Sequence, residues 1–110
     1  MLVGTNGGTA TFATSSNRVR TANGYTGLDC DFKLDVRWSQ PASQLTFKLL
    51  TTAQPASIEA FDGNNVMVGS KTQAPQQHVV SQVTFPAPNS VRAIVTSPAD
   101  EVVLLEFCAT

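Results

Sequence analysis

The sequence predicts an all-β domain, built as an antiparallel sandwich or barrel of eight or nine short strands. Apolar and polar residues alternate along most of the chain, and no segment shows the helical period of about 3.6 residues. Turn-forming residues separate these segments roughly every ten residues, a spacing typical of all-β sandwiches and barrels. The 110 residues suffice for one domain and are too few for two ordinary ones. We therefore expect a single domain over residues 1–110, with residues 1–8 flexible.

The clearest predicted strand covers residues 32–39. Its apolar residues Phe32, Leu34, Val36 and Trp38 fall on one face, and its polar residues fall on the other. This alternation predicts one face against the core and one in water, and it places Phe32 and Trp38 in the core. Pro41 ends the strand because proline has no NH group to donate to a central ladder.

The remaining strands are predicted from the same alternation. In chain order they cover residues 9–13, 18–22, 44–51, 57–61, 66–71, 78–85, 90–96 and 101–108. Residues 62–65 (Asp-Gly-Asn-Asn) tolerate the positive backbone angles of a hairpin turn. Six phenylalanines fall one to a strand, which is typical of aromatic layers between two packed sheets. In the last strand, the alternation predicts that Val103, Leu105 and Phe107 lie opposite Val102, Leu104 and Glu106.

Composition limits the partners that this chain can take. The formal net charge is −1 and 14% of the residues are charged, without the clustered Lys and Arg that nucleic acid or an acidic membrane requires. No run approaches the ~18 apolar residues of a membrane-spanning helix. Thr, Ser, Gln and Asn make up 35 of the 110 residues, and they suit outward strand positions and tight turns. We therefore expect no nucleic-acid partner and no membrane insertion.

Two segments carry a resemblance to a known family. The first, from Gly27-Leu28-Asp29-Cys30-Asp31-Phe32 to Trp38-Ser39-Gln40-Pro41, resembles the G-L-x-I-x-F-S-x-P-V start of galactose-binding-like jelly rolls. The second, which ends in Ala60-Phe61-Asp62-Gly63-Asn64, resembles their V-x-A-Y-D-x-x-G-N hairpin. The resemblance covers roughly residues 24–108. It implies an all-β antiparallel two-sheet β-sandwich of jelly-roll type with eight or nine strands. It also implies a non-catalytic carbohydrate-binding or adhesive module, of the kind often found within larger exported bacterial proteins.

The motifs of common enzymes are missing, so we expect no catalytic activity. His78 is the single histidine, and no nucleophile-elbow, zinc-binding, P-loop or dinucleotide motif occurs. Cys30 or Cys108 beside His78 would form a nucleophile–base pair, but a buried thiol and a surface histidine explain the same residues. Among the eight acidic residues, the sequence marks no pair as the two carboxylates of a glycosidase.

Strand direction predicts one polar end of the domain. Because successive antiparallel strands run in opposite directions, the loops at residues 23–31, 52–56, 72–77 and 97–100 share an end. A sugar is typically held by an aromatic ring against its C–H face and by polar groups at its hydroxyls. The residues predicted to bind such a ligand are Asn23, Tyr25, Asp29, Gln76 and His78. Loop ends are polar in most proteins, so a solvated surface explains these residues as well.

Three acids at the same end suit a calcium ion. Asp29 and Asp31 flank Cys30, and Asp100 belongs to a loop that is predicted at the same end. Carboxylate oxygens are ligands that calcium prefers. Calcium bound by Asp29, Asp31 and Asp100 is therefore one hypothesis, and solvated carboxylates with no cofactor are the other.

Two further functions fit the predicted fold. A structural or assembly module would bind another protein chain, or form a homo-oligomer, through exposed apolar residues such as Met67, Val79 and Leu104. A small-ligand-binding β-barrel would instead enclose a cavity lined by Trp38. A non-catalytic module with carbohydrate as its partner is the leading hypothesis.

The two cysteines are predicted to be free thiols. Cys30 precedes a strand at the polar loop end, whereas Cys108 ends a strand that starts there. A strand of about seven residues spans about 23 Å, and a disulfide needs its Cα atoms within about 7 Å.

Overall fold

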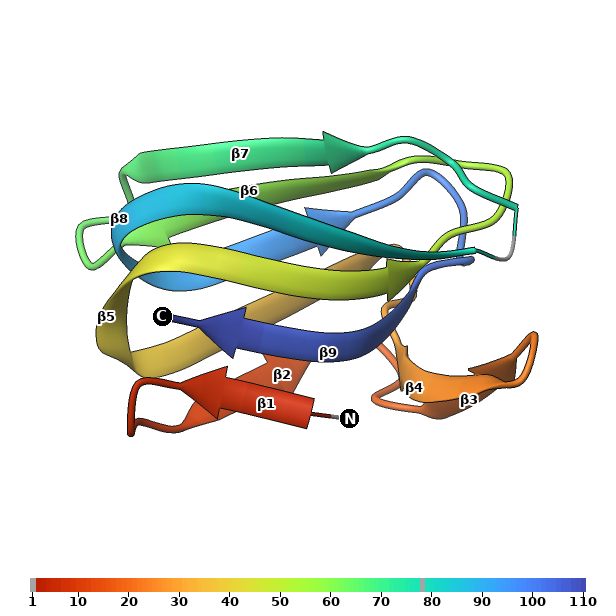
Figure 1. Cartoon of the computed structure of the whole chain (residues 1–110), viewed down its shortest axis with the longest axis horizontal. Helices are drawn as coiled ribbons and strands as arrows, with labels where there is room; N and C mark the ends of the chain where they lie inside the picture. Colours follow the sequence, from red (N-terminus) through yellow and green to blue (C-terminus); the bar gives the residue numbers. More distant parts are fainter. Residues whose placement is uncertain (1, 78) are drawn as a thin grey trace.

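Every regular element in the computed structural model, which describes residues 2–77 and 79–110, is a β-strand (Figure 1). The strands are β1 (Leu2–Thr5), β2 (Ala10–Ala13), β3 (Val19–Ala22), β4 (Tyr25–Asp29), β5 (Lys33–Leu50), β6 (Ala56–Asp62), β7 (Met67–Gln73), β8 (Val80–Thr96) and β9 (Val103–Ala109). The all-β prediction is confirmed. Within the described ranges, no helix is long and apolar enough to cross a membrane.

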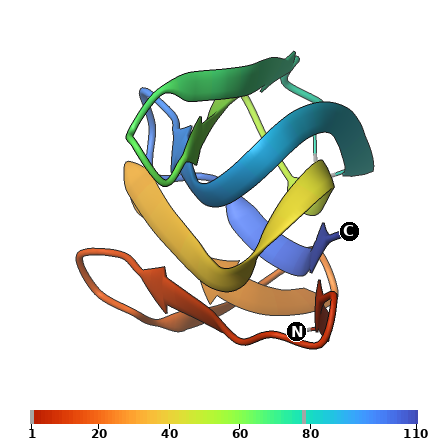
Figure 2. The ribbon, with the colours of Figure 1, turned by 90° about the vertical axis from the view of Figure 1, so that its left-hand side faces the viewer.

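Two long strands, β5 and β8, bend and belong to both layers of the sandwich (Figures 1 and 2). Residues 33–37 of β5 pair with residues 92–96 of β8, while residues 44–50 of β5 pair with residues 80–86 of β8. The ladder between them shifts register around Pro41, which has no NH group to donate. Each long strand was predicted as two separate strands, because the sequence signals the bend but not the continuity of the ladder.

The hydrogen-bonded strand order is β3-β4-β9-β5-β8-β6-β7, with β2 paired to β5 and β1 paired to β9. The β1–β9 pairing is parallel, and the other pairings are antiparallel. Residues 2–5 form β1 where the sequence predicted no strand. These directions gather the connections at residues 30–32, 51–55, 74–77 and 97–102 on the right of Figure 1, and this end is called the loop end below. The predicted antiparallel β-sandwich is therefore confirmed, and three of the four predicted loops gather at this end. The fourth prediction, a loop over residues 23–31, was wrong for residues 25–29, which form β4.

The core between the layers centres on Phe107. Its ring lies 5.1 Å from that of Phe47, 5.2 Å from that of Trp38 and 5.9 Å from that of Phe12, measured between centroids. Trp38 is buried, and its indole NH donates to the carbonyl of Ser90 at 2.8 Å. Trp38 therefore packs in the core, as the alternation predicts.

Phe32 corrects the predicted core. Although the alternation places it beside Leu34 and Val36, its side chain is 59% exposed. Asp31, directly before it, has a φ angle of +53°, which interrupts the extended backbone two residues before β5 begins. Phe32 therefore lies in a turn and not in the strand, and the period of two does not apply to it.

Leu104 corrects the predicted exposed surface. Its side chain is fully buried, whereas Met67 and Val79 are exposed as expected. Along β9, Glu106 pairs with Lys48 and Leu104 pairs with Leu49, so Leu105 is an extra residue in the ladder. Such a bulge reverses the alternation, and Leu104 and Phe107 both turn inward.

The two cysteines lie at opposite ends of the sandwich, as predicted. The backbone NH of Cys30 bonds to the carbonyl of Val102, just before β9, while Cys108 is the penultimate residue of that strand. Both thiols are free. Six residues of β9 separate the two places, about 20 Å along a strand.

Phe107 and Phe32 provide a matched test of this core. Phe107→Ala is expected to lower the free energy of unfolding by about 3–5 kcal/mol, because it removes the ring that three other aromatic rings contact. Phe32→Ala is expected to change it by less than about 0.5 kcal/mol, because its ring is mostly in water. Urea unfolding measures both values, and equal losses would contradict the placement of Phe32.

Candidate functional site

The turn from Asp29 to Phe32 organises the loop end. Asp29 ends β4, which lies close on β9 because Gly27 has no side chain; a Cβ atom there would overlap the carbonyl oxygen of Leu104. The backbone NH of Asp31 donates to Asp29 Oδ1 at 3.0 Å, and this bond closes the turn. Asparagine and aspartate tolerate the left-handed backbone that Asp31 adopts. The turn leaves Cys30 buried in the core and Phe32 exposed.

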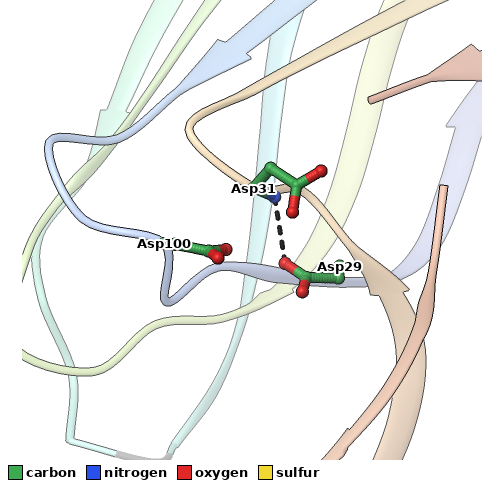
Figure 3. A group of neighbouring side chains, drawn as sticks. All are labelled: Asp29, Asp31 and Asp100. Carbon is green, nitrogen blue, oxygen red and sulfur yellow. Dashed lines mark hydrogen bonds between the residues drawn. The ribbon is translucent and has the colours of Figure 1, made fainter. Parts of the chain in front are cut away.

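Three carboxylates gather beside this turn, one oxygen from each lying within 4.8 Å of the others (Figure 3). Asp29 and Asp31 are buried at the end of β4, and the partly buried Asp100 comes from the β8–β9 loop. These are the acids that strand direction placed together in the sequence. Their grouping is therefore confirmed.

The three acids differ in how their oxygens are satisfied. Asp29 Oδ2 lies 3.3 Å from the Arg18 guanidinium. The carboxylate of Asp31 accepts hydrogen bonds of 2.8–3.0 Å from the hydroxyl of Ser15 and from the backbone and hydroxyl of Ser16. In contrast, Asp100 Oδ1 is buried and has no hydrogen-bond partner among the described residues.

A hollow of about 360 Å³ gives access to this cluster. It is lined by Arg18, Val19, Arg20, Asp29 and Asp100. Arg18 pairs with Asp29, and Arg20 donates to the backbone carbonyl of Asp100 at 2.9 Å. The charged walls of this hollow are therefore largely engaged with one another.

The pKa values of Asp100 and Asp31 are shifted in opposite directions. Burial raises the pKa of Asp100 above its ordinary value. The charges of Asp29 and Asp31 raise it further, as does the hydrogen bond that Asp100 can donate to Asp29 only when it is protonated. Burial alone would also raise the pKa of Asp31, but the hydrogen bonds from Ser16 and Ser15 outweigh it and hold that pKa below its ordinary value. Asp100 therefore holds a proton more readily than Asp31 does.

The Cys30 thiol lies among the same acids. Burial, together with the charges of Asp29, Asp31 and Asp100, raises its pKa to about 12. A thiol with such a pKa is protonated at neutral pH, and the thiolate is the reactive nucleophile. The geometry therefore does not support Cys30 as a catalytic nucleophile.

A second hollow, of about 330 Å³, lies beside the exposed ring of Phe32. It is lined by Ala13, Thr14, Ser15, Phe32, Lys33 and Asp35. Asp35 accepts two hydrogen bonds from Arg92, at 2.7 and 3.1 Å, and lies 3.5 Å from Arg37. The hydrogen bonds from Arg92, with a smaller contribution from Arg37, hold the pKa of Asp35 below its ordinary value. This space is called the Phe32 hollow below.

The other residues predicted to bind a ligand lie in different places. Asn23 occupies the β3–β4 turn with a φ angle of +50°, followed by Gly24 at +83°, the backbone that an Asn-Gly hairpin turn requires. Tyr25, 44% exposed, starts β4, and Asp29 ends that strand about 13 Å further along. Gln76 is exposed, and its backbone NH donates to the hydroxyl of Thr51 at 3.0 Å. His78 lies outside the described residues, and a shared ligand site for this set stays a prediction.

Sequence reasoning missed the Phe32 hollow. Its lining comes from the end of β2, from the loop after it and from the start of β5, which are distant in sequence. One signal was available in Asp29-Cys30-Asp31, because an Asp before a strand often adopts a left-handed turn. Such a turn would have moved Phe32 out of the core.

Asp100→Asn tests the electrostatics of the cluster. Because its pKa in the folded protein is raised, ionisation of Asp100 destabilises the native state as the pH rises through that value. With a chelator present, the variant is expected to be more stable than the wild type at neutral pH, and the difference should vanish in acid. Urea unfolding from about pH 3.5 to 8 measures it.

Asp31→Asn is the matched control for this experiment. The pKa of Asp31 is lowered, so its charge stabilises the native state at neutral pH and its replacement is expected to cost stability there. If the two variants changed stability in the same direction at neutral pH, the opposite pKa shifts of Asp100 and Asp31 would be wrong.

The comparisons with known proteins concern the fold. No protein-family profile matches the chain, and no curated protein matches it by sequence. Among solved structures, a family 6 carbohydrate-binding module is similar with a TM-score of 0.56 and 12% identity, over 91% of this chain and 87% of the other. The lectin domain of lectinolysin, complexed with Lewis B antigen, is similar with a TM-score of 0.53 and 9% identity, over 92% of this chain and 90% of the other. The chain therefore shares the β-sandwich fold of these two domains, and the β-sandwich that its resemblance to galactose-binding-like domains implied is confirmed.

Proposed function

We propose that this chain is a non-catalytic carbohydrate-binding module that binds a sugar in the Phe32 hollow at its loop end. The observation that carries the proposal is an aromatic ring, 59% exposed, in a hollow of about 330 Å³ whose lining combines apolar surface with a few polar groups. Small-molecule sites commonly start at about 300 Å³ and combine apolar surface with a few polar groups. The similarity in fold to a carbohydrate-binding module and a lectin domain supports the same function.

The lining groups match the chemistry of a sugar. The Phe32 ring offers a flat apolar face to the C–H groups of a pyranose. Thr14 and Ser15 offer hydroxyls, which both donate and accept hydrogen bonds, as sugar hydroxyls do. Because the Ser15 hydroxyl donates to Asp31, its lone pairs are left to accept a hydrogen bond from a ligand.

The loop that contributes these hydroxyls is held in place before any ligand binds. The backbone NH of Thr14 donates to Asn17 Oδ1 at 2.9 Å, and the backbone NH of Asn17 donates to Thr14 Oγ1 at 2.8 Å. Ser15 and Ser16 are anchored to Asp31. Such preorganisation lowers the entropy lost when a ligand binds.

The hollow favours binding over catalysis. Hydrolysis of a glycosidic bond generally requires two carboxylates, one as an acid and one as a base or nucleophile. Among the described residues that line the hollow, Asp35 is the single carboxylate, and Arg92 and Arg37 engage both its oxygens. This arrangement supports recognition of a sugar without its cleavage.

We also propose that Asp29, Asp31 and Asp100 hold a calcium ion. The three carboxylates lie within 4.8 Å of one another, and the buried Asp100 Oδ1 has no partner among the described residues. Oxygen ligands suit calcium, and the hollow lined by Arg18 and Arg20 gives access from solvent. The ion would neutralise the repulsion that otherwise raises the pKa of Asp100.

Phe32→Ala and Tyr25→Ala distinguish the two candidate sugar sites. A glycan array identifies sugars that the wild type binds, and calorimetry then compares the variants with the best of them. Phe32→Ala is expected to weaken binding at least tenfold, which corresponds to about 1.4 kcal/mol. Tyr25→Ala is expected to leave the affinity within about twofold, because Tyr25 does not line the hollow.

Two results would contradict this proposal. If the wild type bound no glycan on the array, the proposed function would be wrong. If Tyr25→Ala abolished binding while Phe32→Ala did not, the sugar would bind at the residues first predicted around Tyr25 and not in the Phe32 hollow.

Calcium is expected to raise the melting temperature of the wild type at about 1 mM, within the range of extracellular calcium sites. Asp100→Asn should remove most of this increase, because it takes away one carboxylate ligand. Glu59→Gln, which replaces an exposed acid on β6, should keep the full increase. A wild type whose melting temperature is the same with calcium and with chelator would contradict the proposed ion.

A further inference from the structure

We propose that the Phe32 hollow selects sugars that carry a carboxylate, such as uronic and sialic acids. This inference rests on the proposed function, because it names the class of sugar that the same hollow binds. Lys33 is the residue that carries it.

Lys33 is an exposed cation without an ion pair or hydrogen-bond partner among the described residues. Five of the seven basic residues have an acidic or carbonyl partner, namely Arg18, Arg20, Arg37, Lys48 and Arg92. Lys71 on β7 is the other exposed lysine without one, and it does not line the hollow. In a chain with only 14% charged residues, Lys33 is the lining charge left to bind a ligand.

The one acid that lines the hollow does not cancel this cation. Both oxygens of Asp35 are engaged by Arg92, at 2.7 and 3.1 Å, and Arg37 lies 3.5 Å away. Three cations therefore accompany one carboxylate around the hollow. An anionic ligand would meet a positive potential there, although the whole chain has a formal net charge of −1.

Asp31 is the next acid to consider, because Ser15 connects it to the hollow. Its side chain is buried, and its oxygens accept hydrogen bonds from Ser15 and Ser16. It does not line the hollow, and the hydroxyl of Ser15 lies between its carboxylate and that space. The charge of Asp31 reduces the positive potential at the hollow. A carboxylate ligand would still bind more tightly with Lys33 than with a neutral side chain at position 33.

Phe32 and Lys33 are adjacent in sequence, one in the turn and the other at the start of β5. An acidic sugar presents an apolar C–H face and, at the edge of its ring, a carboxylate. The Phe32 ring and the ammonium group of Lys33, at the end of a flexible four-carbon stem, can therefore bind one sugar at two places. Thr14 and Ser15 remain for its hydroxyls.

The expected preference is modest and depends on salt. An exposed ion pair contributes a factor of up to about five in affinity, and salt weakens it. The matched probes are trigalacturonate and its methyl ester, which differ in charge, and sialyllactose and lactose. At low salt the wild type should bind the acid of at least one pair about three- to fivefold more tightly, and about 0.5 M salt should remove most of the difference.

Lys33→Gln is expected to abolish the preference, measured as the ratio of the affinities for the acidic and the neutral probe. Lys71→Gln is the matched control, because it removes an exposed lysine that does not line the hollow, and it should keep the preference. Phe32→Ala should weaken binding of the acidic and the neutral probe alike. This pattern would support Lys33 as the residue that determines specificity.

The failures of the two proposals can be told apart. Equal binding of acidic and neutral probes by the wild type, with both weakened by Phe32→Ala, would overturn the acidic preference and leave the proposed function intact. An acidic preference that persists in Lys33→Gln would also overturn the inference, since another residue would then recognise the carboxylate. If no probe bound and the glycan array were also empty, both proposals would fall.

Discussion

The hydrogen bond from the backbone of Asp31 to the side chain of Asp29 sets the arrangement of the loop end. It closes a turn in which Asp31 adopts a left-handed backbone, and this single reversal determines where four consecutive side chains lie. Cys30 enters the core, Phe32 stays in water, and the carboxylates of Asp29 and Asp31 are held beside Asp100. An extended backbone at Asp31 would have returned Phe32 to the alternation of β5. Neither the carboxylate cluster nor the Phe32 hollow would then exist in this form.

Asp31 also connects the two candidate sites. Its carboxylate belongs to the acidic cluster and also accepts a hydrogen bond from Ser15, which lines the Phe32 hollow. The repulsion within the cluster is relieved by a proton on Asp100 or by a bound cation, and either leaves Asp31 ionised to anchor the loop. The Ser15 hydroxyl is therefore held by a carboxylate whose charge also interacts with Asp29 and Asp100. The acidic cluster and the Phe32 hollow are therefore connected through the single carboxylate of Asp31.

The sequence was sufficient where a structural feature depends on a regular pattern. The alternation located Leu34, Val36 and Trp38 in the core, and the direction of the strands grouped Asp29, Asp31 and Asp100 across about 70 residues of chain. It failed where one backbone angle or one extra residue changes the pattern. The positive φ angle of Asp31 places Phe32 outside the strand, and the bulge at Leu105 turns Leu104 into the core. The alternation of apolar and polar residues indicates neither of these changes. β1 was missed because its pairing uses the free edge of β9, which a local pattern does not contain.

The low charge of the chain makes its unpaired groups informative. With few charged residues, most arginines and lysines have a partner within the fold, and neutral Thr, Ser, Asn and Gln cover much of the remaining surface. Two groups without a described partner lie on the two sides of the Asp29–Phe32 turn. Asp100 Oδ1 is a buried hydrogen-bond acceptor without a donor among the described residues. Lys33 is an exposed cation without an ion-pair partner among them, and it lines the Phe32 hollow. A buried acceptor without a donor costs free energy, so a proton or a cation at Asp100 would stabilise the folded protein. An exposed ammonium group is satisfied by water, so its ligand must compete with hydration, and this limits the affinity that Lys33 adds.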